Sequence, residues 1–135
     1  MRVDLMHEMS LMYDILQMIQ DDAVKYGIIK IEKVELTVGE ICNAMPDALK
    51  MAFEVFKVQN QHFLSDSSQL IIEIEKAVAE CVVCQKKYVP DNRISFCPDC
   101  DMPSGKIISG ENLQVLSYEG RNRNENYIAD RRSDK

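Results

Sequence analysis

The sequence predicts an α+β fold with two helices, a small mixed three-stranded sheet and an inserted module built on two C-x-x-C knuckles. Two segments place apolar residues at helical spacing, and three others alternate apolar and polar residues as half-buried strands do. Four of the five cysteines form two C-x-x-C pairs between residues 81 and 100. A chain of 135 residues is long enough for one domain with a small satellite module.

The two predicted helices are amphipathic. The first covers residues 9–26 and ends before Gly27, which suits a left-handed C-terminal cap. The second begins at Pro46, a residue favoured in the first turn of a helix. Each carries four apolar residues at the spacing i, i+3, i+4, i+7: Met12, Ile15, Leu16 and Ile19 in the first, and Leu49, Ala52, Phe53 and Phe56 in the second.

The predicted strands cover residues 33–39, 70–75 and 111–120, and residues 59–69 form a polar loop. The cysteines lie between the second and third strands. If these two strands pair antiparallel, the module can project from the sheet without breaking it. The predicted organisation is therefore an α/β domain of residues 1–79 and 106–120, an insert of residues 80–105, and a disordered tail of residues 121–135, which has few apolar anchors.

Charge and composition exclude several classes of protein. The chain has a formal net charge of −6; its last 15 residues hold five basic and three acidic side chains, so the remainder holds −8. Such an acidic body repels phosphate backbones. Apolar runs are too short for a transmembrane helix, and charged residues interrupt the run that a signal peptide needs. Five cysteines, an odd number, fit a reduced cytosolic protein better than a disulfide framework.

The two C-x-x-C pairs predict a metal site formed by Cys81, Cys84, Cys97 and Cys100. Two residues between ligands let a tight turn aim both sulfurs at one point, and two such turns give a tetrahedral site. Zinc is the expected metal and makes the insert zinc-ribbon-like; iron in a rubredoxin-like site and four unmetallated thiols are the alternatives. Because the insert has few large apolar residues, the metal would supply its folding free energy, on the order of 10 kcal/mol. Four protein ligands leave no open position, so we expect a structural role.

Two other functions compete at this point. Zinc ribbons often serve as adaptors in transcription or other nucleic-acid machinery, but the basic residues of the insert (Lys86, Lys87 and Arg93) are balanced by its acidic ones (Asp91, Asp99 and Asp101). A one-iron redox protein is the other competitor. The sequence contains neither a nucleophile–base pair nor a phosphate-binding glycine loop, so we expect no enzymatic activity and no nucleic acid or membrane as partner.

A second constellation gives the chain a family resemblance. The segments "MHEMSL" (6–11), "VELTVGEICNAMPDALKMAFEVF" (34–56) and "GENLQVLSYE" (110–119), in this order around the two C-x-x-C pairs, resemble the HypA/HybF family of hydrogenase maturation nickel chaperones. The cysteine pairs alone would be generic. The Met-His-Glu start and the Val-Gly-Glu after the first strand make the resemblance specific.

The resemblance implies a metallochaperone that delivers Ni²⁺ for [NiFe]-hydrogenase assembly and, in some organisms, for urease. It implies a GTPase of the same pathway and the hydrogenase large subunit as partners, and it leaves a monomer or a homodimer open. Nickel would bind at His7, which we expect just before the first helix, with Glu8 and Met6 as neighbours, and zinc at the four cysteines. Glu40 is a weaker nickel candidate, and Cys42 is expected to be a small buried hydrophobe.

One feature departs from the family pattern. Its Met-His-Glu motif usually begins the chain, whereas here "MRVDL" precedes Met6. If Met6 is the true start, the terminal amine lies beside His7. If the chain starts at Met1, that amine is five residues away and the nickel ligands must differ.

Overall fold

The computed structural model describes residues 5–90, 95–122 and 126–130. In chain order its elements are α1 (Leu5–Val24), β1 (Lys30–Gly39), α2 (Pro46–Gln59), β2 (Leu64–Glu75), β3 (Val78–Cys81), β4 (Lys87–Tyr88), β5 (Gly105–Ser109), β6 (Leu113–Arg121) and β7 (Asn126–Asp130). These elements form two compact units. Neither helix is long and apolar enough to cross a membrane.

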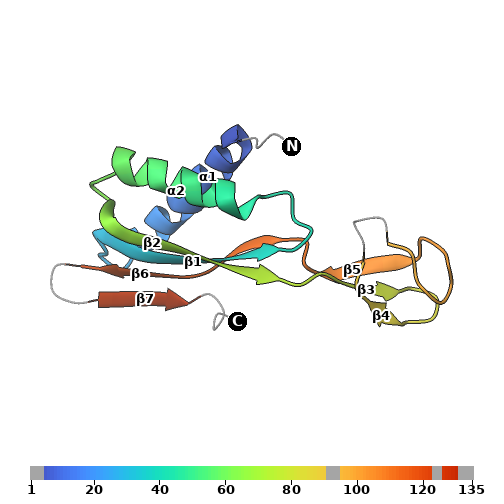
Figure 1. Ribbon diagram of the computed structural model, residues 1–135. Helices are drawn as coiled ribbons and strands as arrows, with labels where there is room; N and C mark the ends of the chain where they lie inside the picture. The colour runs from blue at the N-terminus through green and yellow to red at the C-terminus, as the bar shows by residue number, and fades with distance from the viewer. Residues whose placement is uncertain (1–4, 91–94, 123–125, 131–135) are drawn as a thin grey trace. The chain divides into compact units, whose positions relative to one another are not determined.

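The first unit combines both helices with a sheet in the order β2-β1-β6-β7. The arrows in Figure 1 show β1 and β2 running in the same direction and β6 in the opposite one, so the sheet is mixed as predicted. The helices lie on one face of this sheet (Figure 1). A parallel pair needs a crossover connection, and α2 provides it between β1 and β2.

The core of this unit lies between the helices and the sheet. All eight apolar residues predicted to face the core from the two helices are buried, which confirms both amphipathic patterns. Val34 and Leu36 of β1 are also buried. The buried Tyr118 of β6 donates its hydroxyl to Asp22 of α1 at 2.5 Å, so its polar atom is satisfied inside the core.

The second unit contains residues 37–43 and 73–113, and therefore includes the predicted insert (80–105) and extends beyond it. Its sheet has the order β4-β3-β5, with β3 antiparallel to both neighbours. Two carboxylates connect segments of this unit that are distant in the sequence. Glu40 accepts a hydrogen bond from the backbone N–H of Ala77, and Glu75 accepts one from the backbone N–H of Gly110, both at 2.8 Å. Glu40 was predicted as a weak nickel candidate, and its carboxylate is instead hydrogen-bonded to the backbone at Ala77.

Three predictions about the elements were wrong. Helix α1 begins at Leu5, so His7 lies inside it rather than before it. Strand β2 begins at Leu64, within the predicted loop. The second and third predicted strands (70–75 and 111–120) do not pair with each other, because β1 lies between β2 and β6. Local sequence patterns report burial and backbone preference, and they carry no information on which strands become neighbours.

The prediction of a disordered tail over residues 121–135 was wrong for Asn126–Asp130. These five residues form β7 and pair antiparallel with β6, from Asn126 opposite Arg121 to Asp130 opposite Ser117. Backbone hydrogen bonds to an open sheet edge stabilise a segment whose composition alone does not predict order. Arg121, the last residue of β6, is also ordered, whereas residues 123–125 and 131–135 lie outside the described residues.

We expect Gly110→Ala to destabilise the protein more than Gly27→Ala. Both glycines have left-handed backbones (φ +91° and +71°), so each substitution carries about 1–2 kcal/mol of conformational cost. A Cβ at Gly110 would also lie 2.4 Å from the Ala77 Cα, whereas a Cβ at Gly27 has no neighbour within 4 Å. Denaturant unfolding followed by amide signals of each unit should show at least about 1 kcal/mol of extra loss for Gly110→Ala. Equal losses would mean that the approach to Ala77 relaxes freely.

Candidate metal sites

The structure brings the four predicted cysteines together. The sulfurs of Cys81, Cys84, Cys97 and Cys100 all lie within 4.8 Å of one another. The closest pairs are Cys81–Cys100 at 3.8 Å and Cys84–Cys97 at 3.7 Å. A tetrahedral ion with metal–sulfur bonds of about 2.3 Å separates its ligands by about 3.8 Å, so the cluster has the dimensions of a four-thiolate site.

Each knuckle turns its backbone amides toward its first sulfur. The N–H groups of Val83 and Cys84 donate to the Cys81 sulfur at 3.3 and 3.4 Å, and that of Cys100 donates to the Cys97 sulfur at 3.4 Å. Such bonds stabilise thiolates and orient them before a metal arrives. Cys81 and Cys97 are buried and Cys84 is exposed, so the ion would be covered on one side and accessible at the first knuckle.

The thiols influence one another's ionisation. The pKa of Cys81 is lowered to about 6, because the Cys84 backbone N–H and the Ser104 hydroxyl donate to its sulfur. The pKa of Cys100 is raised to about 12, chiefly by the neighbouring sulfurs of Cys84 and Cys81. Four thiolates this close repel one another, and a bound divalent cation would compensate their negative charge. The donor set therefore fits a closed, soft-ligand metal site.

The second candidate site is the first turn of α1. The His7 Nδ1 lies 3.3 Å from Oε2 of Glu8, and the His7 side chain is 45% exposed. Glu8 is only 2% exposed, and the same oxygen accepts the backbone N–H of Met45 at 2.8 Å. The carboxylate thus connects an accessible imidazole to the start of α2, where Met45 is the N-cap residue.

Sequence reasoning missed the partnership between Glu8 and Met45. The two residues are 37 positions apart, and a backbone N–H has no signature in a sequence. The available signal was Pro46: it marks the start of a helix, whose first backbone N–H groups need an acceptor from elsewhere. An acidic group at this position also interacts favourably with the positive end of the helix dipole.

The other residues considered as metal ligands differ in their exposure and position. Met6 is 76% exposed and neighbours His7 in the first turn of α1. Cys42, predicted to be buried, is only partly buried, because it lies in the connection between β1 and α2. His62, the other histidine of the chain, is exposed. Glu40 belongs to the second unit, as described above.

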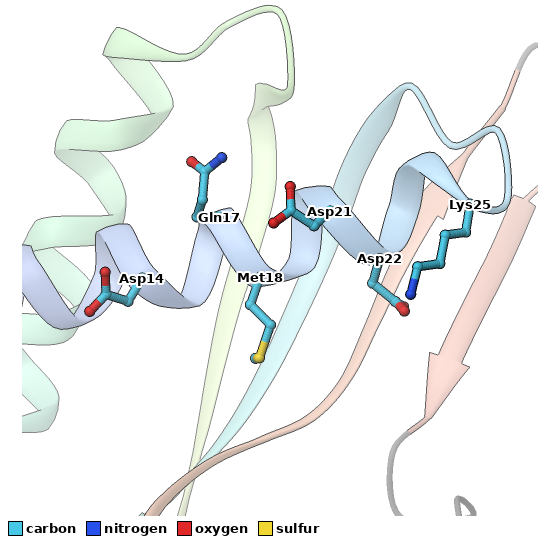
Figure 2. A pocket seen from close by; sticks show the side chains of 6 residues that line it. All are labelled: Asp14, Gln17, Met18, Asp21, Asp22 and Lys25. Atoms are coloured by element: carbon cyan, nitrogen blue, oxygen red, sulfur yellow. The ribbon is translucent and has the colours of Figure 1, made fainter.

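An acidic hollow also lies along α1. Its volume is about 560 Å³, and Figure 2 shows the side chains that line it: Asp14, Gln17, Met18, Asp21, Asp22 and Lys25. Within the described parts of the chain, only the four cysteines form a group of three or more potential ligands close enough for one ion. The carboxylates of the hollow are therefore not arranged as a metal site.

Comparison with known proteins identifies the family of the chain. A family model described as "Hydrogenase/urease nickel incorporation, metallochaperone, hypA" matches residues 6–120, which include both sites. The chain belongs to the HypA family. This confirms the resemblance predicted from the Met-His-Glu and Val-Gly-Glu segments, and the match begins at Met6.

Curated HypA relatives agree over most of their length. The hydrogenase maturation factor HypA of Aquifex aeolicus is 32% identical over 114 residues, which cover 84% of this chain and 96% of that protein. The same factor from Desulfitobacterium hafniense is 33% identical over 114 residues, covering 84% and 97%. The solution structure of the Ni metallochaperone HypA from Helicobacter pylori is 25% identical, with a TM-score of 0.61 over 86% of this chain and 98% of that one.

We expect Gln85→Gly to stabilise the metal-loaded second unit more than Asp101→Gly. Each residue directly follows a knuckle in a left-handed conformation, with φ of 65° and 54°. Glutamine tolerates this region poorly, whereas aspartate visits it more readily. The free energy of unfolding should rise by about 0.5–1 kcal/mol for Gln85→Gly and by less for Asp101→Gly. These values already include the loss of stability that arises because glycine makes the unfolded chain more flexible. Denaturant midpoints with metal bound measure it; a loss at Gln85→Gly would show that its side chain contributes more than its backbone costs.

Proposed function

We propose that this protein is a nickel metallochaperone that binds Ni²⁺ at His7 and delivers it for maturation of [NiFe]-hydrogenase, while Cys81, Cys84, Cys97 and Cys100 hold a structural Zn²⁺. The observation that carries the proposal is the contact of His7 with the buried Glu8. It belongs to a segment that matches a nickel-incorporation family. The protein acts as a carrier, and we expect no catalysis.

The first turn of α1 suits a nickel ion that must be released. If the Nδ1 proton of His7 is held toward the Glu8 carboxylate, the lone pair of the neutral imidazole is on Nε2, which is a good ligand for Ni²⁺. Backbone amide nitrogens of the first turn of α1 lie beside His7 and are further candidate ligands for nickel. Met6 is exposed beside them as a further possible contact.

The four-thiolate group suits the opposite task. It offers four ligands at tetrahedral spacing and leaves no position for exchange, so a bound ion would be retained. Iron fits the same geometry, but zinc is favoured because the expected role is structural. Separate sites for the retained ion and the delivered ion let one small chain bind two metals, each at its own site.

The recipients follow from the pathway of the family. We propose a nickel-handling GTPase and the hydrogenase large subunit as partners, with urease as a second possible client. The five cysteines of the described chain are free thiols, which fits work in the reducing cytosol. A zinc-ribbon adaptor of nucleic-acid machinery is disfavoured, because the formal net charge of the chain is −6.

The proposal is tested by nickel titration of His7→Ala beside His62→Ala. His62 is the only other histidine of the chain and is also exposed, so it is a matched control. Calorimetry with zinc already bound should show at least about a tenfold loss of nickel affinity, about 1.4 kcal/mol, for His7→Ala only. Equal affinity in the two variants would exclude His7 as the nickel ligand.

The N-terminal residues are tested by comparing the full chain with one that starts at Met6. In the shorter chain the terminal amine, an amide and the His7 imidazole lie within reach of one ion. The pKa of such an amine is about 7.7–8.0, so nickel can displace its proton near neutral pH. We expect tighter binding and square-planar d–d bands in the shorter chain. Matching affinities and spectra would mean that the amine takes no part.

The structural role of the metal is tested with Cys97→Ala, using Cys42→Ala as the control that keeps all four knuckle thiols. Cys97→Ala should lose the bound zinc and disorder the second unit, because metal binding supplies its folding free energy. The helices and their sheet should still unfold cooperatively, since they have their own core. Metal analysis and amide spectra report both effects. Complete loss of the folded state in Cys97→Ala would show that the first unit depends on the metal.

A further inference from the structure

Strand β7 is an addition to the part of the chain that matches the HypA family. The family match ends at residue 120, inside β6, whereas β7 covers Asn126–Asp130. The match to the Aquifex aeolicus relative already covers 96% of that protein, which leaves few residues there for a further strand. Without β7, the sheet order β2-β1-β6-β7 would end at β6, and Figure 1 shows β7 along the outer side of β6. Strand β7 therefore covers an edge that the matched part of the chain would leave open.

The covered edge consists of the backbone of Tyr118 and Gly120. The carbonyl of Arg121 accepts the N–H of Ile29 at 3.0 Å, on the side of β1. Because backbone groups alternate sides along a strand, Glu119 also faces β1, whereas Tyr118 and Gly120 direct their N–H and C=O groups toward β7. The two residues each offer one donor and one acceptor, and these groups form what we call the β6 edge.

The rest of the first unit holds the β6 edge in place. The Tyr118 side chain is buried, and its hydroxyl donates to Asp22 of α1 at 2.5 Å. Gly120 is also buried, and a Cβ at this position would lie 2.6 Å from both the Cγ2 of Ile28 and the carbonyl oxygen of Lys30. The edge is thus preformed, so a strand that binds to it does not have to order it.

The backbone contribution that holds β7 to this edge is small. Of its five residues, Tyr127 and Ala129 lie opposite Gly120 and Tyr118, and only these two direct their N–H and C=O groups toward the β6 edge. Each hydrogen bond contributes little net free energy in water, and ordering the backbone of five residues opposes that contribution with a comparable cost. Release of β7 without unfolding of the sheet is therefore within reach, and a strand from another molecule can compete for the same edge.

We propose that the β6 edge is a docking site for an extended segment of a partner protein, and that β7 is its internal competitor. The register indicates the chemistry of this segment, because β7 places its largest residue, Tyr127, opposite Gly120 and its smallest, Ala129, opposite Tyr118. Residues directly opposite each other share a face of the sheet, so a large residue suits the space beside a glycine and a small residue leaves room for a tyrosine. The partner segment pairs antiparallel with β6 and carries an aromatic residue followed, two positions later, by a small one. Neither candidate metal site includes a residue of β6, so failure of this proposal would leave the nickel and zinc assignments untouched.

Hydrogen exchange of the unsubstituted, zinc-loaded chain tests whether β7 is released. The amides of Tyr118 and Gly120 face β7, whereas the amide of Glu119 between them faces β1 and is the internal control. If β7 leaves without unfolding the sheet, the first two amides should exchange at least about tenfold faster than that of Glu119. Equal protection of all three would overturn the proposal, because β7 would then open only together with the sheet.

Peptide binding tests the chemistry of the partner. The full chain carries either Ala129→Pro, which removes an N–H directed at β6, or the control Ile128→Pro, whose N–H faces away from β6. The probe is a fluorescent peptide with the sequence of residues 122–130, and anisotropy should show at least about tenfold tighter binding to Ala129→Pro, because its internal competitor is weakened. A peptide of the same composition, with Tyr127 and Ala129 exchanged, should bind at least about tenfold more weakly. No binding to Ala129→Pro, or equal affinity for the two proteins or of the two peptides, would contradict the proposal.

Discussion

The carboxylate of Glu8 is the group on which the start of α2 and the proposed nickel site depend. It is buried, and burying a carboxylate is unfavourable unless hydrogen bonds compensate it. Here the compensation comes from the backbone N–H of Met45 at 2.8 Å, beside the positive end of α2. The same oxygen lies 3.3 Å from the imidazole of His7. Placement of the imidazole is therefore a consequence of how α1 and α2 pack, and not a property of a flexible terminus.

The two candidate metal sites illustrate opposite solutions to metal binding. Four sulfurs within 4.8 Å of one another surround a single position and leave no place for exchange. At the other site one exposed imidazole is oriented by one buried carboxylate, and further donors must come from the backbone or from the partner that receives the ion. A carrier needs the second arrangement for its cargo, because an incomplete ligand set allows transfer. It can use the first arrangement to fold a unit that has little core of its own.

Local patterns predicted the parts of this fold that depend on local physics. The faces of Met12 to Ile19 and of Leu49 to Phe56 are buried as their spacing indicates, and the two knuckles converge as their two-residue separations require. What could not be predicted depends on distant partners. The position of β1 between β2 and β6 and the bond from Met45 to Glu8 each join segments that lie far apart in the sequence. Glu40 was considered as a metal ligand because its actual partner, the backbone N–H of Ala77, is 37 residues away and cannot be recognised from the local sequence.

The central claim is that Glu8 serves the fold and the nickel site at once. It is tested most directly by measuring, in Glu8→Ala, both the hydrogen exchange of the Met45 amide and the affinity for nickel. A hydrogen bond to a charged group contributes about 1.5–3 kcal/mol, so Met45 should exchange at least about tenfold faster. Because His7 loses its orienting contact, nickel affinity should fall together with that protection, while zinc stays bound. Nickel affinity equal to that of the unsubstituted protein, in a variant whose Met45 amide has lost its protection, would contradict the account and leave Glu8 only the role of capping α2.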